Sequence, residues 1–151
     1  MIRSAIVILI AILSLTGCGV PEMFRIEDPS ARVGSVSVTG SSEHGEQVTV
    51  YVKVRNPNAA PLPLLSAHYT LIVAGETVTF EDEVHRTLPS EGMQTVPLPV
   101  ALASPGRTLA GRSFDLRGSI TYKPPGQFRK LLTESRIPLP AISFAGSGQV
   151  Q

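Results

Sequence analysis

The sequence predicts an all-β domain, and three observations support that class. Several short segments alternate apolar and polar residues with a period of two, which is typical of strands with one buried face. Turn-forming residues separate these segments, with 13 Pro and 13 Gly in a chain of 151 residues. Tryptophan is absent, and aromatic residues make up only 5% of the chain. We therefore expect a core built mainly from valine, leucine and isoleucine.

The clearest strand covers residues 47–56. One side of it carries only valines, whereas the opposite side carries polar or amphipathic residues. The valines are Val48, Val50, Val52 and Val54, and the residues between them and after them are Thr49, Tyr51, Lys53 and Arg55. This alternation predicts a strand whose valine face packs on the core.

The strand ends at Asn56-Pro57-Asn58. Pro57 has no N–H to donate and restricts the preceding residue to extended backbone angles. Asn58 can bond its own backbone two residues on and tolerates a left-handed conformation, and Pro61 and Pro63 keep the following segment extended. We expect the chain to cross from one sheet to the other here, with Asn56 and Asn58 satisfying backbone groups at the crossing.

The other strands are expected at residues 31–39, 66–74, 77–84, 93–102, 114–122 and 128–142. Two of them have a clear period-two face, formed by Ala67, Tyr69, Leu71 and Val73 in residues 66–74 and by Phe114, Leu116, Gly118, Ile120 and Tyr122 in residues 114–122. Pro97 and Pro99 each lack a ladder donor, which indicates that residues 93–102 form an edge strand or an irregular extended segment. Seven strands within about 110 residues match the size of an immunoglobulin- or fibronectin-III-like β-sandwich. Residues 143–151 are expected to be a disordered tail.

An ordered series of motifs accompanies the valine strand and the Asn-Pro-Asn turn. It consists of Tyr69, Gly75, Leu88-Pro89, Ser90-Glu91-Gly92, residues 96–100, residues 114–122 and residues 137–140. The series resembles the water stress and hypersensitive response (WHy) domain of the folded, atypical late embryogenesis abundant (LEA) proteins, over roughly residues 31–142. The resemblance implies a sandwich fold and an association with stress protection, and it implies no shared catalytic site.

The N-terminal residues 1–17 read as a signal peptide. Arg3 supplies a positive charge, and residues 5–15 form an apolar run. As a helix this run would be about 16 Å long, roughly half of a ~30 Å hydrocarbon core. It is therefore too short for a transmembrane span and fits the apolar region of a signal peptide.

Leu15, Thr16, Gly17 and Cys18 resemble the lipobox of bacterial lipoproteins, in which the cysteine is lipidated on sulfur and becomes the new N-terminus. Cys18 is the single cysteine of the chain, so no disulfide is expected. The alternative is a chance cysteine at an ordinary cleavage site. The resemblance implies palmitate at Cys18, a membrane partner through the lipid anchor, and a place in the cell envelope. By the same resemblance, Gly19 favours the outer membrane, facing the periplasm, if the host is Gram-negative.

These features divide the chain into a signal peptide (1–17), a lipidated tether (18–30), a WHy-like domain (31–142) and a tail (143–151). The formal net charge is +1, and removing the signal peptide leaves equal numbers of basic and acidic residues. A neutral chain without a basic patch gives no reason to expect a nucleic-acid partner.

Three histidines are the candidates for catalytic or metal-binding residues. His44 lies in a predicted turn, and His68 alternates with the core residues of its strand and should face solvent. His85 follows Glu81-Asp82-Glu83, but consecutive residues of a strand point to opposite faces and cannot all bind one ion. No nucleophile elbow, phosphate-binding loop or dinucleotide fingerprint is present. We therefore expect no enzyme activity, no cofactor and no metal.

Two functions are consistent with the sequence. The resemblance implies a membrane-anchored, non-catalytic domain that protects proteins or membranes under desiccation or related stress. The alternative is an adaptor lipoprotein that presents a sheet edge or loop face to a client or another protein of the envelope.

Overall fold

The computed structural model describes residues 26–103 and 107–151. The predicted signal peptide, the lipobox residues Leu15, Thr16 and Gly17, and Cys18 lie outside these residues. The described part contains seven strands and one helix. They are β1 Ser30–Ser42, β2 Gly45–Arg55, β3 Leu62–Val73, β4 Glu76–Leu88, β5 Met93–Leu102, β6 Ser113–Tyr122, α2 Gly126–Glu134 and β7 Ala141–Gln149.

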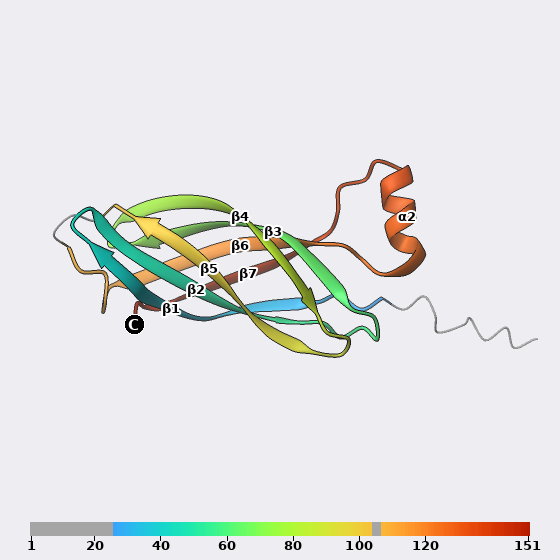
Figure 1. Cartoon of the computed structure of the whole chain (residues 1–151), viewed down its shortest axis with the longest axis horizontal. Helices are drawn as coiled ribbons and strands as arrows, with labels where there is room; N and C mark the ends of the chain where they lie inside the picture. Colours follow the sequence, from blue (N-terminus) through green and yellow to red (C-terminus); the bar gives the residue numbers. More distant parts are fainter. Residues whose placement is uncertain (1–25, 104–106) are drawn as a thin grey trace, which may run out of the picture.

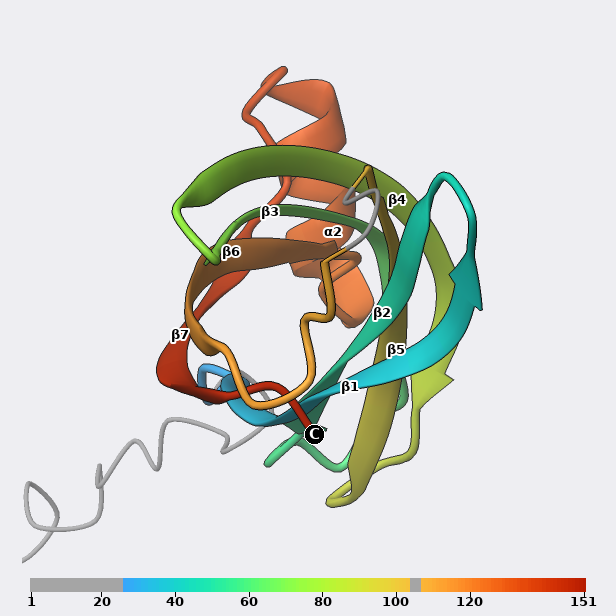
Figure 2. The ribbon, with the colours of Figure 1, turned by 90° about the vertical axis from the view of Figure 1, so that its left-hand side faces the viewer.

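The strands form two antiparallel sheets, with the order β1-β2-β5 in one and β4-β3-β6-β7 in the other. This arrangement confirms the predicted all-β sandwich. Figure 1 shows the two sheets running along the length of the molecule, and the end-on view in Figure 2 shows them curving around a common core. Tight turns join β1 to β2 and β3 to β4, whereas the chain changes sheets between β2 and β3, β4 and β5, and β5 and β6.

The core forms where the inward faces of the two sheets meet. All four valines of the predicted inner face of β2 are fully buried, as are Ala67, Tyr69 and Leu71 of β3. From β6 come Phe114, Leu116, Ile120 and Tyr122, each at most 8% exposed. The period-two alternation therefore identified the buried face of these three strands correctly.

A bulge in β3 explains why its buried residues change parity along the strand. Leu62 and Leu64 are buried, but the next inward residue is Ala67, because the register with β4 and β6 shifts between Leu64 and Ser66. On the β4 side of this irregularity lies His85, whose φ of 41° is left-handed. Such bulges bend a strand and re-aim its side chains.

Of the two alternatives predicted for residues 93–102, the edge strand is confirmed, because among the described strands β5 pairs only with β2. In an antiparallel strand the N–H and C=O of one residue point to the same side. The Pro99 carbonyl accepts a hydrogen bond from the Tyr69 hydroxyl on the side away from β2, so the missing N–H of Pro99 also faces that side. Pro97, two residues earlier, shares this orientation. Both prolines therefore remove donors from the open edge and none from the sheet.

The predictions for the C-terminal region were wrong in two respects. Residues 128–142 do not form a strand: they contain most of α2, and the last strand begins only at Ala141. Phe128, Leu131 and Leu132 have the spacing of one helical face, and Leu132 is 6% exposed. Pro138 and Pro140 follow the helix, in the segment that leads to β7.

The predicted disordered tail of residues 143–151 is instead the strand β7, with Val150 buried after it. The Val38 N–H donates to the Gln151 carbonyl, and the Gln151 N–H donates to the Val36 carbonyl, so the chain end closes the sandwich against β1. A Cβ on Gly146 would lie 2.8 Å from the Cβ of Val33. The glycines of this segment therefore reflect close packing and not disorder.

The tether also ends earlier than residue 30. β1 begins at Ser30, Pro29 is buried, and Glu27 is hydrogen-bonded to Asn58. The N-terminal segment is thus part of the fold from Glu27 onward. Within the described residues, no helix has the length and apolar character needed to cross a membrane.

Candidate functional site

Asn56 and Asn58 form a hydrogen-bonded cluster that we call the asparagine hub. Asn56 is fully buried, and its Nδ2 donates to the carbonyls of Ala60 at 2.9 Å and Pro89 at 3.0 Å. Its Oδ1 accepts from the backbone N–H of Asn58 at 3.1 Å. Asn58 in turn binds Glu27, accepting from its N–H at 2.9 Å and donating to its carbonyl at 2.8 Å. The hub therefore holds together the N-terminal segment, the crossing between β2 and β3 and the crossing between β4 and β5.

The hub satisfies backbone groups, as the sequence predicted, but by a different route. Asn58 was expected to bond its own backbone or adopt a left-handed conformation, whereas it is Asn56 whose side chain bonds the backbone two residues on, at Asn58. Among the described residues, the non-glycine positions with positive φ do not include Asn58. Both donors of the Asn56 amide are used, and its oxygen accepts from both the N–H and the Nδ2 of Asn58. This saturation gives the hub a structural role.

The histidines and acidic residues do not gather at one point. His44 is exposed in the turn between β1 and β2, and the His85 Nε2 lies 2.6 Å from the Glu83 carboxylate at the surface. Asp82, between Glu81 and Glu83, points the other way and accepts a hydrogen bond from Tyr69. Within residues 26–103 and 107–151, no group of three His, Cys, Asp or Glu side chains is placed to hold a metal ion.

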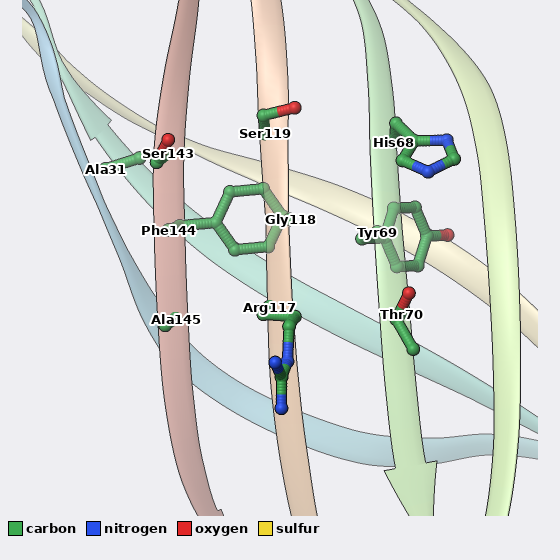
Figure 3. A pocket seen from close by; sticks show the side chains of 10 residues that line it. All are labelled: Ala31, His68, Tyr69, Thr70, Arg117, Gly118, Ser119, Ser143, Phe144 and Ala145. Carbon is green, nitrogen blue, oxygen red and sulfur yellow. The ribbon is translucent and has the colours of Figure 1, made fainter.

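A shallow depression of about 700 Å³ crosses the outer face of the larger sheet. Its floor is the backbone at Tyr69, Gly118 and Phe144, which pair side by side. The side chains of Tyr69 and Phe144 are buried on the inner face. Figure 3 shows this row between two rows of outward side chains. The outer rows are His68, Ser119 and Ser143 on one side and Thr70, Arg117 and Ala145 on the other. The depression is therefore a gap between rows of mostly small side chains.

Gly118 makes this arrangement possible. A Cβ at position 118 would lie 2.5 Å from the Tyr69 Cβ and 2.7 Å from both the His68 carbonyl oxygen and the Phe144 ring. The Phe144 ring lies across Gly118 in Figure 3, filling the space that a side chain would need. The glycine thus serves the packing of two aromatic residues.

One row of the outer face carries the residue types of a nucleophile, a base and an acid. Glu81 pairs with His68, and His68 pairs with Ser119, across three neighbouring strands. Sequence reasoning missed this row because the three residues are far apart in the chain and meet only through strand pairing. No hydrogen bond joins His68 to either neighbour in the described part of the chain. The row lies on an open sheet surface, so the geometry of an activated serine is not formed.

Among the described residues, the titratable group with the largest pKa shift is Tyr69, which is fully buried. Its hydroxyl donates to the Asp82 carboxylate at 2.8 Å and lies 3.2 Å from the Pro99 carbonyl of the opposite sheet. Burial is the main cause that raises the pKa of Tyr69, and the hydrogen bond to Asp82 and the charge of Asp82 raise it further. The ring stacks on Phe80 at a centroid distance of 5.6 Å. Tyr69 therefore links the two sheets as a neutral phenol.

Comparison with known proteins defines the class of fold. No protein-family model matches the chain, and no curated protein matches its sequence. Among solved structures, the chain is similar to a protein named as late embryogenesis abundant, At2g46140.1, with a TM-score of 0.61 and 19% identity, covering 97% of this chain and 84% of that one. It is also similar to AT1g01470 from Arabidopsis thaliana, with a TM-score of 0.57 and 17% identity, covering 84% of this chain and 83% of that one. The chain thus has an LEA-type β-sandwich fold, as the motif series implied.

Proposed function

We propose that this chain is a lipid-anchored protein of the bacterial cell envelope whose WHy-type domain protects proteins or membranes during desiccation or related water stress. The observation that carries the protective role is the fold shared with a late embryogenesis abundant protein over most of both chains. The observation that supports the anchor is the sequence Leu15-Thr16-Gly17-Cys18 after a short apolar run. The domain acts by surface contact, without turnover.

The contacts of the described residues fit a surface that binds without chemistry. The polar groups of the asparagine hub are used within the fold, and the histidines lie apart at the surface. Among residues 26–103 and 107–151, only the row of Glu81, His68 and Ser119 combines the groups of a hydrolase. It is therefore the row that any test of catalysis must address.

The lipid anchor is tested by feeding labelled palmitate to cells that express the full chain. We expect label in a membrane-bound protein, and we expect the Cys18→Ser variant to lose both the label and stable membrane association, because several acyl chains at about 0.8 kcal/mol per buried methylene hold a protein firmly. An unlabelled wild-type protein in the soluble fraction would contradict the anchor.

The protective role is tested by drying a labile enzyme with the fragment of residues 26–151, which retains the bonds between Glu27 and Asn58. We expect recovered enzyme activity to rise in proportion to the amount of fragment, as for a stoichiometric shield. The matched control is an inert protein of equal size and charge, and equal protection by that protein would remove the support for this role.

Substitution of all three histidines, at positions 44, 68 and 85, separates protection from catalysis. We expect protection to persist in this variant, because no histidine has a chemical role in surface contact. A hydrolytic activity of the wild type that the His68→Ala variant abolishes would show that the domain is an enzyme.

The second candidate is an adaptor for another protein of the envelope. The observation that favours it is the exposure of large apolar side chains on and near α2, such as Phe128 and Leu131. Exposed apolar groups that lie together mark surfaces that contact other molecules. Recovery of one stoichiometric partner from gently solubilised envelopes would favour this role.

A further inference from the structure

The exposed large apolar side chains of the described residues lie at one end of the molecule. They are Ile26 (37% exposed), Met93 (55%), Phe128 (44%), Leu131 (55%) and Ile137 (51%). Phe128 and Leu131 are three residues apart on α2 and so share one side of the helix. Leu132, the next residue along α2, is buried.

The hydrogen bonds and Figure 1 place the elements that carry these residues at the same end of the molecule. Ile26 precedes Glu27, which is bound to Asn58 of the asparagine hub. Met93 follows Gly92, whose carbonyl accepts from the Asn56 N–H. Figure 1 shows α2 projecting beyond the sheets at this same end, while the turns between β1 and β2 and between β3 and β4 lie at the opposite end. We call this end, with α2 and the asparagine hub, the helix end.

The α2 segment of the helix end is positively charged, in contrast to the rest of the chain. Residues 123–137 contain four basic residues, Lys123, Arg129, Lys130 and Arg136, and one acidic residue, Glu134. The remainder of the chain has nine basic and eleven acidic residues. All five charged residues of the segment are exposed. Basic and apolar groups that alternate along a short helix suit an anionic lipid surface.

The path of the chain brings the helix end to the membrane, and this step rests on the proposed lipid anchor. Cys18 and Ile26 are separated by eight residue steps, which span roughly 29 Å at most. Glu27 and Asp28 then lead directly into the fold, and Asp28 and Pro29 line one depression together with Tyr122 and Pro140, the residues on either side of the α2 segment. An anchor at Cys18 therefore keeps α2 near the bilayer.

We propose that the helix end is a membrane-docking surface in which α2 lies in the interface of an anionic bilayer, with Phe128 and Leu131 among the acyl chains and the basic residues at the headgroups. A helix of nine residues is about 13 Å long, so it can lie in the interface but cannot cross the core. Docking fixes the long axis of the sandwich relative to the membrane and directs the opposite end away from it.

The test uses the absence of tryptophan from the chain. The full, lipidated protein is prepared as a Leu131→Trp variant and reconstituted into vesicles of phosphatidylglycerol and phosphatidylcholine, in which some lipids are brominated to quench indole fluorescence. A His44→Trp variant is the matched control, because His44 is exposed in the turn at the opposite end. We expect a blue-shifted, lipid-quenched emission from position 131 and a water-like, unquenched emission from position 44.

The role of charge is tested in the Leu131→Trp protein by adding Lys123→Gln or Lys130→Gln. Each substitution should lower the ratio of docked to undocked protein about fivefold on anionic vesicles, since one basic residue near such a surface contributes about that factor. Vesicles of pure phosphatidylcholine should show weak quenching at position 131 for all variants.

Three outcomes would overturn the proposal. Equal emission from positions 44 and 131 on vesicles would mean that neither end is selected. A blue shift at position 131 without lipid quenching would mean that protein covers the face, either a second copy or an envelope partner. Equal quenching on anionic and neutral vesicles would remove the role of charge.

Flotation of the protein with the vesicles reports the lipid anchor separately, and we expect the Cys18→Ser variant to lose it. Failure of docking and failure of the proposed function are therefore distinguishable.

Discussion

Asn56 is fully buried, and its side-chain nitrogen and oxygen are both hydrogen-bonded. We therefore expect its substitution to lower the stability of the fold more than other substitutions in the asparagine hub. Its amide donates to two carbonyls and its oxygen accepts from Asn58, so both sheet crossings at the helix end depend on one side chain. An unpaired buried carbonyl or N–H costs about 1–3 kcal/mol, whereas a group that can turn to water costs less. Asn58 contacts the exposed residue Glu27, which water can reach.

Substitutions in the hub should therefore follow an order. We expect Asn56→Leu to lower the free energy of unfolding by about 2–3 kcal/mol and Asn58→Val by about 1–2 kcal/mol. The reason is that the fully buried Asn56 side chain makes four hydrogen bonds, two of them to the sheet crossings, whereas the Asn58 side chain makes three, two of them to the exposed Glu27. The exposed control Lys53→Gln should change it by less than about 0.5 kcal/mol. Urea denaturation midpoints measure all three, and equal midpoints would show that the turn is incidental to stability.

At the scale of elements, β5 shows how an exposed edge is protected. An unpaired strand edge is a template for pairing with another chain. In β5 the two prolines remove donors on the open side, and the Pro99 carbonyl is occupied by Tyr69, so this edge offers few groups to an incoming strand. The opposite side of the sandwich uses a different solution, in which the C-terminal residues pair with β1.

Restoring the donors should make the protein associate. We expect the Pro97→Thr, Pro99→Thr double variant to remain folded but to aggregate faster on concentration, because two new N–H groups face outward on a strand of β-favouring residues. The control Ala101→Thr places the same side chain on the same strand without adding a donor. Light scattering against protein concentration measures the effect, and identical curves for both variants would contradict this role of the prolines.

At the scale of the whole molecule, Tyr69 joins the two sheets near β4 and β5, where no backbone ladder connects them. Its hydroxyl contacts Asp82 on its own sheet and Pro99 on the other. Burial first, and then Asp82, raise the pKa of this phenol in the folded state above its ordinary value near 10. The folded protein therefore retains a proton that the unfolded chain releases in strong alkali.

This difference gives stability a defined dependence on pH. The contribution of a raised pKa is fully present below the unfolded value near pH 10 and is lost progressively as the pH rises above it, by up to about 1.4 kcal/mol per pH unit. We expect wild-type denaturation midpoints to fall more steeply between pH 10 and 11 than those of Tyr69→Phe, which has no proton to lose there.

The variant itself should be about 1 kcal/mol less stable at pH 8. Parallel pH profiles would exclude this linkage. Burial and the charge of Asp28 also raise the pKa of Tyr122. Tyr122 is present in both proteins, so its contribution to the pH dependence cancels in the comparison.

The sequence by itself determined the all-β class, the buried faces of β2, β3 and β6, the edge position of β5 and the crossing at Asn56-Pro57-Asn58. These features depend on contacts between residues one or two positions apart, such as the alternation of valines or the missing N–H of a proline, and such contacts are fixed by local order in the chain. The tertiary structure decided the rest. Gly146 serves the close approach of β7 to Val33, so a glycine-rich segment that looks disordered becomes a strand, and the row of Glu81, His68 and Ser119 exists only through pairing across three strands. Likewise, only the folded chain brings Ile26, Met93 and the apolar face of α2 to the same end of the molecule. These residues are distant in sequence, and the packing of the two sheets decides at which end each strand and α2 lie.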